Sequence, residues 1–223
     1  MSALVALTAQ NTVAVTAVHE LPNEFVVEQL DAVFDDIGVD AAKTGMLFSR
    51  RLIETVADFL ERRGVPLVVD PVMVASSGAR LLQEDAVATY VERLFPLATV
   101  VTPNLAEAET LAGFRGPRRA LAERIRELGA DAVVVTGGHG EESGDLLLND
   151  EGELVIPVER LDRGATHGSG CTHSATLAAY LARGASLREA ARAAATAASA
   201  AVERGFEELG AGEGPVDVLA VAR

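Results

Sequence analysis

Short apolar runs alternate with amphipathic stretches along most of the chain, and this alternation predicts an α/β fold with a mainly parallel sheet. The apolar runs that predict buried strands cover residues 41–45, 67–70, 99–102 and 132–136. Apolar spacing of three and four residues, with capping residues at the starts, predicts helices over residues 22–38, 49–64, 85–94, 104–113, 118–128, 172–183 and 187–204.

Two further pairs of apolar runs lie outside this alternation. The first pair, residues 1–8 and 13–18, opens the chain. The second pair, residues 145–148 and 154–158, flanks Asn149-Asp150-Glu151-Gly152, whose residue types are typical of a hairpin turn. We therefore expect an antiparallel pair at one edge of the otherwise parallel sheet.

Length and composition predict a single domain covering residues 1–223. With 223 residues, of which 49% are hydrophobic, the chain can bury one sizeable core. Its net charge of −14 argues against nucleic acid as a partner, because no basic surface is available to neutralise phosphates. One cysteine cannot form an internal disulfide, and neither a leader pattern nor an apolar run of about 18 residues occurs. We expect a cytoplasmic protein with no membrane partner.

The segment most typical of a binding site is the glycine-rich stretch at residues 164–172, which runs straight into a predicted helix. Gly168 and Gly170 have no Cβ, so the backbone there can adopt positive φ angles and approach a ligand closely. The free N–H groups and the dipole of the helix favour phosphate or a developing negative charge. Cys171 falls in the first turn, where a thiol pKa tends to be lowered. The alternative is a flexible loop that only separates two elements.

Polar residues also stand where three predicted strands end. They are Asp70, Asn104 with Glu107, and the segment 136–139. Because open α/β sheets bind ligands at the carboxyl edge of their strands, we expect these residues to converge with residues 168–171. Two carboxylates beside a phosphate site suggest a magnesium ion held largely through water. Taken singly, each carboxylate has a simpler explanation, Asp70 as a cap of the next turn and Glu107 as a complement to its helix dipole.

Six short motifs, in this order, resemble the hydroxymethylpyrimidine/phosphomethylpyrimidine kinase family of the ribokinase-like superfamily. They are TAQNT at residues 8–12, KTGML at 43–47, VDPVM at 69–73, TPNLAEA at 102–108, GGH at 137–139 and THGSGCT at 166–172. The resemblance implies a three-layer α/β/α sandwich, a homodimer, and ATP-dependent phosphorylation of 4-amino-5-hydroxymethyl-2-methylpyrimidine and of its monophosphate in thiamine biosynthesis. Pyridoxal kinases of the same branch share the cysteine loop and are the nearest enzymatic alternative.

By this resemblance, individual residues acquire expected roles in substrate and metal binding. Gln10 matches the glutamine that reads the pyrimidine edge, which suits an amide because it offers both a donor and an acceptor. Met46 and Val72 match the apolar walls around the pyrimidine ring. Asp70 and Glu107 match the acidic positions associated with Mg-ATP.

The resemblance also implies the phosphate-handling residues. The nucleotide-binding positions are Asn104, Thr136, Gly138 and Thr166, and the anion hole consists of Gly168, Ser169 and Gly170. Cys171 stands where related sugar kinases carry an aspartate base, so a thiolate there could accept the proton of the substrate hydroxyl. The alternative for Cys171 is a small buried residue packed under the loop.

The chain departs from the family pattern in two places. The family normally begins about 40 residues earlier, with a strand and a glycine-rich segment, so we expect the first β-α segment of the fold to be absent. Thr136 stands where the family usually has lysine, and since threonine can only hydrogen-bond, we expect weaker ATP binding or a lower rate. A ligand-binding protein without catalysis is therefore the rival from another class. We interpret Lys43 as structural, and His167 and His173 as ordinary loop residues rather than metal ligands.

Overall fold

The computed structural model describes residues 1–74, 78, 81–83, 85–137, 144–158, 161 and 163–221. Its centre is a six-stranded sheet with the strand order β3-β4-β5-β6-β7-β8. The parallel strands are β3 (Ala42–Thr44), β4 (Leu67–Val69), β5 (Val100–Val101) and β6 (Val133–Val135). The antiparallel strands are β7 (Asp145–Asn149) and β8 (Gly152–Ile156). Both the parallel sheet and the antiparallel pair at its edge confirm the expectation from the sequence.

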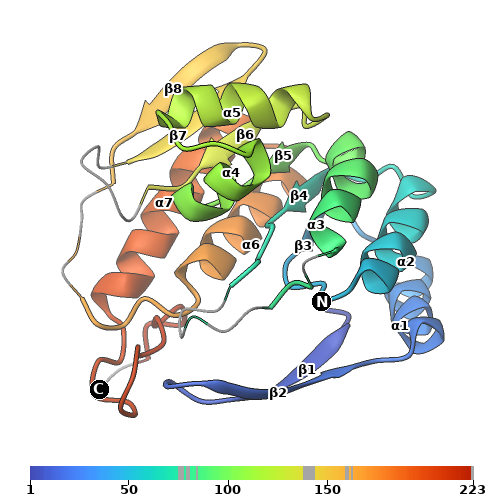
Figure 1. Ribbon diagram of the computed structural model, residues 1–223, viewed down its shortest axis with the longest axis horizontal. Helices are drawn as coiled ribbons and strands as arrows, with labels where there is room; N and C mark the ends of the chain where they lie inside the picture. The colour runs from blue at the N-terminus through green and yellow to red at the C-terminus, as the bar shows by residue number, and fades with distance from the viewer. Residues whose placement is uncertain are drawn as a thin grey trace.

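Helices cover both faces of this sheet and give the fold three layers (Figure 1). One face carries α2 (Arg50–Glu61), α3 (Ala86–Thr89), α4 (Leu105–Ala112) and α5 (Arg118–Glu127), and the other carries α6 (Ser169–Ala182) and α7 (Leu187–Glu203). α1 (Asn23–Asp36) packs against α2. None of the helices in the described part of the chain is long and apolar enough to cross a bilayer.

The strands β4, β5 and β6 are apolar along their whole length because both of their faces are buried. Alternate side chains enter two separate cores, as the two-residue period of a strand requires. Val69, Val101 and Val133 belong to the core under α2 to α5, whereas Val68, Val100 and Val134 belong to the core under α6 and α7. These central strands therefore have no solvent-facing side, and the polar residues Asp70, Asn104 and Thr136 follow them at the sheet edge.

Three helices begin at the capping residues expected from the sequence. The Ser49 side chain accepts the N–H of Leu52 at the start of α2. Asn104 and Ser186 each form a capping box with a glutamate three residues later. These caps satisfy N–H groups that have no partner inside the helix and so fix where each helix starts. Asn104 lies only three residues after the end of β5, so its cap also sets the direction in which α4 leaves the sheet edge.

The stretch 85–94, predicted as one helix, is divided into short pieces. After the single turn of α3 the chain continues as a π-helical turn, η1 (Tyr90–Leu94), and a 3-10 turn, η2 (Phe95–Leu97). Pro96 has no backbone N–H and its ring clashes with the preceding turn, so a regular α-helix cannot continue through it. The Tyr90 hydroxyl, on a fully buried ring, donates to the Gly45 carbonyl at 2.7 Å and ties this irregular segment to the end of β3.

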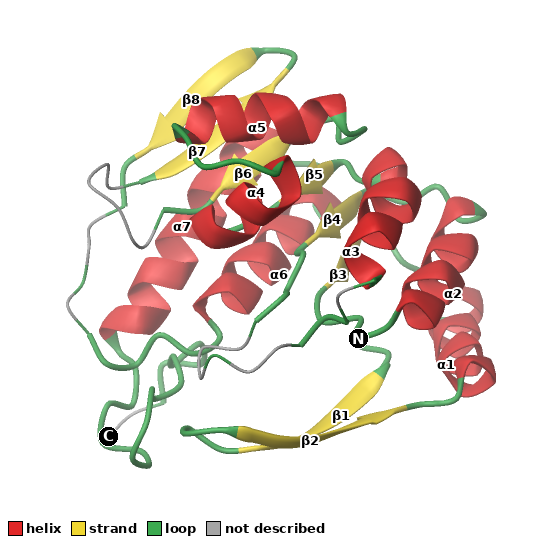
Figure 2. Cartoon of the chain, viewed as in Figure 1, coloured by secondary structure: helices red, strands yellow, loops and turns green. Residues whose placement is uncertain are grey.

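The first two strands form a sheet of their own. β1 (Ala6–Gln10) and β2 (Val15–Glu20) pair antiparallel, with an irregularity between Ala9 and Gln10. Figure 2 shows this hairpin standing apart from the central sheet. Its residues are exposed or half-buried, so it has no core of its own. Because an isolated two-stranded hairpin is only marginally stable in water, its position depends on contacts with other segments.

Candidate functional site

The turn before α6 has a geometry that suits an anion. Gly168 adopts a left-handed conformation with φ of 89° and directly precedes the helix, which begins at Ser169. Thr172 N–H donates to the Gly168 carbonyl at 2.9 Å. Between these positions, the N–H groups of Gly170 and Cys171 make no hydrogen bond within the described part of the chain. Two free donors and the positive end of the helix dipole therefore coincide at this turn.

Gly170 does not use the positive φ that a glycine allows. It lies inside α6, and of the two glycines only Gly168 is left-handed. A Cβ placed on Gly170 would meet no atom within 4 Å, because this face of the first turn is open. The absence of a side chain at Gly170 therefore leaves room in front of the free N–H groups, and the conformational requirement falls on Gly168 alone.

Cys171 stands in the first turn of α6 with an exposed side chain, so the alternative of a small buried residue is wrong. The expected lowering of its pKa is also wrong. Partial desolvation by the surrounding protein raises the pKa of the thiol, Lys43 opposes this effect, and Asp70 and Glu107 add to it. The group is accordingly a protonated thiol at neutral pH in the ligand-free chain.

Asp70 lies beneath this turn at the end of β4 and is only 5% exposed. Its Oδ2 accepts the Ser174 hydroxyl at 2.8 Å and lies 3.2 Å from Lys43 Nζ. Three elements, β3, β4 and α6, therefore meet at one carboxylate. Ser174 was not foreseen, and its position one helical turn after Gly170 is the only signal for it in the sequence. Lys43, interpreted as structural, also belongs to the electrostatics of the site, and its being the only lysine was the available signal.

Glu107 combines a structural role with an unusual protonation state. It is 8% exposed, its Oε2 accepts the N–H of Asn104 at 2.9 Å, and its Oε1 accepts the N–H of Met73 at 3.3 Å. Burial raises the pKa of Glu107 to about 7, Asp70 adds to the rise, and the two N–H groups oppose it. A cation beside this carboxyl group would favour its ionised form.

The remaining positions expected to bind nucleotide lie near neighbouring strand ends. Asn104 and Thr136 face each other in an isolated parallel bridge. The N–H and the hydroxyl of Thr136 both donate to the Pro103 carbonyl, at 2.9 and 3.4 Å. The Thr166 carbonyl accepts the first N–H of α6 at 3.0 Å, which places this residue beside the turn at Gly168. Gly138 lies outside the described residues.

The three positions expected to bind the pyrimidine occupy two separate parts of the fold. Met46 and Val72 are half-buried and follow β3 and β4, which pair in register up to Thr44 and Val69. They therefore lie at the same sheet edge as Asp70. Gln10 is exposed at the end of β1, on the hairpin, and its Oε1 lies 3.3 Å from the hydroxyl of a threonine on the same strand.

His173 is not the loop residue expected from the sequence. It lies within α6, is 4% exposed, and its Nε2 is 3.1 Å from Asp145 Oδ2. Within the described residues neither ring nitrogen has the geometry of a hydrogen bond, so this is a close contact between polar groups only. His167 precedes the turn and pairs through its backbone with the C-terminal segment. No three His, Cys, Asp or Glu side chains in the described part of the chain are grouped to hold a metal ion by themselves.

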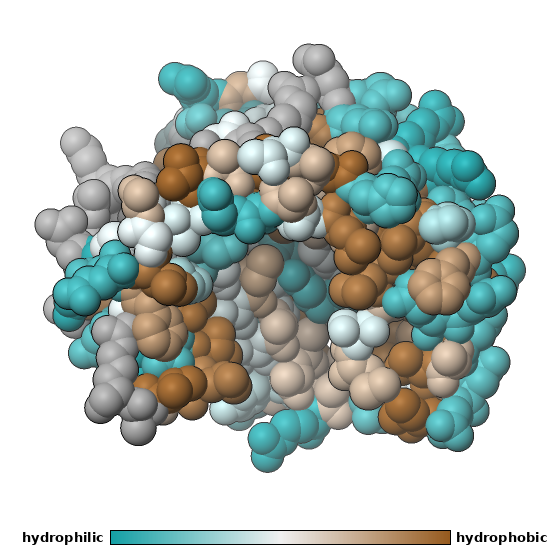
Figure 3. Space-filling model, turned by 90° about the horizontal axis from the view of Figure 1, so that it is seen from below, coloured by the Kyte–Doolittle hydropathy of each residue, from teal (hydrophilic) through white to brown (hydrophobic). Residues whose placement is uncertain are grey.

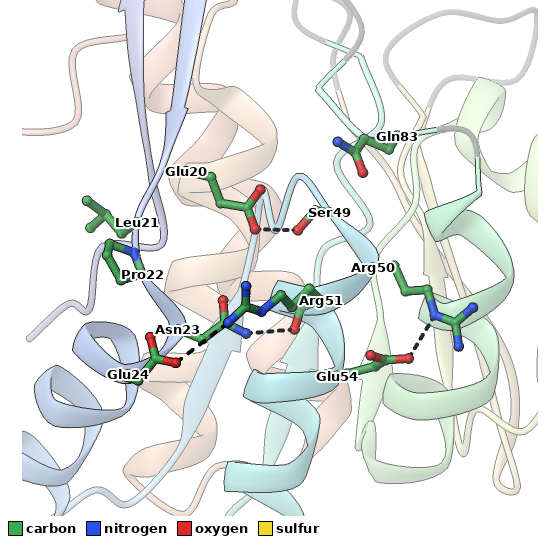
Figure 4. A pocket seen from close by; sticks show the side chains of 10 residues that line it. All are labelled: Glu20, Leu21, Pro22, Asn23, Glu24, Ser49, Arg50, Arg51, Glu54 and Gln83. Atoms are coloured by element: carbon green, nitrogen blue, oxygen red, sulfur yellow. Dashed lines mark hydrogen bonds and ion pairs between the residues drawn. The ribbon is translucent and has the colours of Figure 1, made fainter.

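A separate hollow of about 620 Å³ lies between the end of β2 and the start of α2 (Figure 4). The described residues that line it include none of the residues expected in the site. Two pairs of polar side chains in its lining bind each other, since Arg50 pairs with Glu54 at 2.8 Å and the Ser49 hydroxyl donates to Glu20 at 2.6 Å.

Known proteins similar to this chain are pyrimidine and pyridoxal kinases. The family model for phosphomethylpyrimidine kinase matches residues 1–217. A hydroxymethylpyrimidine/phosphomethylpyrimidine kinase of Rhizobium meliloti (strain 1021) is 47% identical over 96% of this chain and 84% of its own length. The protein of the same name from Bacillus subtilis (strain 168) is 41% identical over 100% of this chain and 85% of its own length.

Solved structures give the same relationship. The ADP complex of Bacillus subtilis pyridoxal kinase has a TM-score of 0.88 at 36% identity and covers 99% of this chain and 86% of its own. A phosphomethylpyrimidine kinase from Clostridium difficile 630 has a TM-score of 0.76 at 35% identity and covers 88% of this chain and 83% of its own.

Proposed function

The chain belongs to the phosphomethylpyrimidine kinase family, and on this premise we propose that it phosphorylates 4-amino-5-hydroxymethyl-2-methylpyrimidine and then the monophosphate. The phosphoryl donor is ATP, and the pathway is thiamine biosynthesis. The observation that carries the proposal is the pair of free N–H groups at Gly170 and Cys171, which stand over the buried carboxylate of Asp70. This arrangement offers donors to a phosphoryl group at the edge where parallel sheets bind ligands.

The chemistry required of the chain is mainly positioning and charge stabilisation. Phosphoryl transfer spreads negative charge over the equatorial oxygens, and preorganised N–H donors stabilise it without further rearrangement. We assign this role to the N–H groups of Gly170 and Cys171, with Gly168 providing the turn. The Cys171 thiol stands at the same turn, and we propose that it first releases its own proton to solvent and then, as the thiolate, accepts the proton of the substrate hydroxyl. Burial raises the thiol pKa and so opposes this step, whereas the positive charge of Lys43 lowers it and favours the thiolate.

The residues present fit a magnesium ion held mainly by phosphate and water. Asp70 and Glu107 are close enough for the charge of Asp70 to raise the Glu107 pKa, and a divalent cation would relieve that repulsion. Oxygen ligands of this kind suit Mg²⁺, which usually keeps several waters and takes one or two carboxylates. When bound, the ion would neutralise phosphate charge during transfer. We propose Asp70 and Glu107 as the carboxylates that face it.

A second candidate activity is pyridoxal phosphorylation. It is favoured by the structural similarity to pyridoxal kinases, which includes a Staphylococcus aureus pyridoxal kinase in complex with pyridoxal at 31% identity and a TM-score of 0.87. The relatives named as pyrimidine kinases reach 47% identity, so we place the pyrimidine first. Comparing the two substrates at equal concentrations, with the same Mg-ATP supply, separates these activities.

We further propose that the chain acts as a cytoplasmic homodimer of single-domain subunits. Large apolar side chains exposed on the hairpin and α1 support an interface there, namely Leu7 at 46%, Val13 at 56% and Phe25 at 51% exposure. In the view from the hairpin side, apolar side chains gather in several clusters around a recessed centre (Figure 3). Sedimentation equilibrium measures the subunit number directly, and a monomer at micromolar concentration would refute the dimer.

The proposed activity is tested by incubating the 223-residue chain with Mg-ATP and the hydroxymethylpyrimidine, and following both phosphorylated products by mass spectrometry. Gly170→Asp places a negative side chain in the open space before the free N–H groups, so product formation should be abolished. Ala179→Asp adds the same charge to an exposed position two turns or more along α6 and should leave it unchanged.

Two results would overturn the proposal. Product formation that survives Gly170→Asp would show that this turn does not bind the phosphoryl group. A folded wild-type chain that binds the pyrimidine in calorimetry without forming product would identify a ligand-binding protein without catalysis.

A further inference from the structure

The hairpin that carries Gln10 is held at its tip by a glycine-rich segment from the far end of the chain. Gly212 N–H donates to the Thr12 hydroxyl at 3.2 Å, across 200 residues of sequence. A Cβ on Gly212 would lie 2.1 Å from the Thr12 carbonyl oxygen, and one on Gly210 would lie 2.3 Å from the Thr12 hydroxyl. Such distances are far shorter than van der Waals contact, so the two backbones approach each other at a spacing that only glycine permits.

The same segment continues along the anion-binding turn. The N–H of His167 donates to the Gly214 carbonyl at 3.1 Å, and the N–H of Val216 donates to the His167 carbonyl at 3.0 Å. A Cβ on Gly168 would lie 3.5 Å from Val216 Cγ2. The segment 210–216 therefore contacts the hairpin at one end and the residues that start the turn at the other.

The far side of the segment is fixed to α7. Asp217, which is 4% exposed, donates its N–H to the Ala201 carbonyl at 2.9 Å, and Arg204 donates to the Asp217 carbonyl at 3.2 Å. The segment thus rests on a long helix of the rigid core. In Figure 1 the hairpin tip and the C-terminal loops lie close together below that core.

We propose that the segment 210–216 is a positioning element for the substrate: it fixes the hairpin tip, and with it Gln10, relative to the Gly168 turn. Gln10 lies two residues before Thr12, so the contact that fixes Thr12 also fixes the side chain assigned to the pyrimidine edge. The hairpin has no core of its own, and without this contact its tip is free to move away from the sheet edge. The identity of the substrate rests on the proposed function, whereas the contact itself does not.

Gly212→Ala is the principal test, because this glycine has no positive φ and the substitution adds only a close contact. Relieving that contact requires the hairpin tip to retreat by about 1 Å, since real Cβ atoms do not approach other atoms closer than 3.0 Å. Thr12→Val removes the hydroxyl that accepts the Gly212 N–H and keeps the shape, while Thr12→Ser keeps the acceptor. Ala211→Ser is the matched control, because it adds one atom to an exposed position between the two glycines.

The first measurement is hydrogen exchange of residues 6–20 in the ligand-free protein. Gly212→Ala and Thr12→Val should raise the exchange rates of the hairpin severalfold, and Thr12→Ser and Ala211→Ser should leave them at the wild-type level. Unchanged hairpin exchange in folded Gly212→Ala would overturn the proposal, whatever the enzyme phosphorylates. Because hydrogen exchange requires no substrate, it tests whether the segment 210–216 fixes the hairpin even if the wild-type chain does not accept the pyrimidine.

The second measurement separates positioning from general stability. Gly212→Ala and Thr12→Val should raise the KM for hydroxymethylpyrimidine about tenfold, because a misplacement of about 1 Å is costly for substrate contacts. The KM for ATP should stay within about twofold of the wild-type value, and Thr12→Ser should restore the pyrimidine KM. Faster hairpin exchange with an unchanged pyrimidine KM, or an equal rise in both KM values, would overturn the positioning role.

Discussion

Replacing Glu107 by glutamine should remove a pH dependence from the stability of the metal-free chain. The ordinary pKa of this group is 4.5, and in the folded chain its pKa is about 7. Between these values the folded chain keeps a proton that the unfolded chain releases, so raising the pH favours unfolding. The stability associated with protonated Glu107 is therefore complete below pH 4.5 and is lost as the pH rises through about 7.

The size of the effect follows from the same two values. A rise in pKa from 4.5 to about 7 corresponds to about 3 kcal/mol, at about 1.4 kcal/mol for each pH unit. Solvent screening reduces this little, because Glu107 is only 8% exposed. Glutamine cannot ionise and retains a single carbonyl acceptor for the N–H groups of Asn104 and Met73. That loss adds a cost of about 1 to 3 kcal/mol that does not vary with pH.

The assay is urea unfolding of both proteins at several pH values between 4.5 and 8, in buffer containing a chelator. The difference in unfolding free energy between wild type and Glu107→Gln should change by about 3 kcal/mol across this range, in favour of the variant at high pH. Glu109→Gln, on the same helix but only half-buried, is the matched control, and its unfolding free energy should vary with pH as that of the wild type does. If the unfolding free energy of Glu107→Gln also varied with pH in parallel with that of the wild type, the reasoning would be refuted.

Three further outcomes are expected. Tyr90→Phe leaves the Gly45 carbonyl without its 2.7 Å donor in a fully buried setting and should lower the unfolding free energy by about 1 to 2 kcal/mol in urea titration. Lys43→Met removes the cation 3.2 Å from Asp70 and should move the pH profile of iodoacetamide alkylation at the single thiol to higher pH. Thr136→Lys adds a positive charge at the end of β6 and should lower the KM for ATP about tenfold in steady-state kinetics, whereas Thr136→Val should not.

The parts of the fold that were predictable are those set by local sequence. The continuous apolar runs of β3 to β6 and the caps at Ser49, Asn104 and Ser186 depend on residues within a few positions of each other. The division of the stretch 85–94 into short helical pieces was not predicted. Pro96 follows this stretch, but the proline also disrupts the helical turn that precedes it. The separation of the β1-β2 hairpin from the central sheet could not be predicted, because a β-branched run indicates a strand but not the sheet to which the strand belongs.

For the residues of the candidate site, the sequence indicated the residue types and their places at element ends but not their environments. The carboxylates and the glycine turn stand at strand and helix ends that periodicity alone locates. The raised pKa of Cys171 was not predictable, because it arises from partial desolvation by other segments of the fold and from Asp70, which lies 101 residues earlier in the sequence. The bond from Ser174 to Asp70 spans 104 residues and was beyond local reasoning for the same reason.

Under the proposed function, the charges of the ligand-free site also constrain how a nucleotide can bind there. Asp70 raises the pKa of Glu107 and of Cys171, and Lys43 is the cation that opposes it at the thiol. A triphosphate brings several more negative charges to the same edge, and two N–H groups at a helix end carry only about half a unit of positive charge. Nucleotide binding by the chain alone is therefore opposed by its own carboxylates. If the proposed magnesium ion binds between the phosphates and these carboxylates, its positive charge attracts both, so the carboxylates that repel free nucleotide would favour its metal complex.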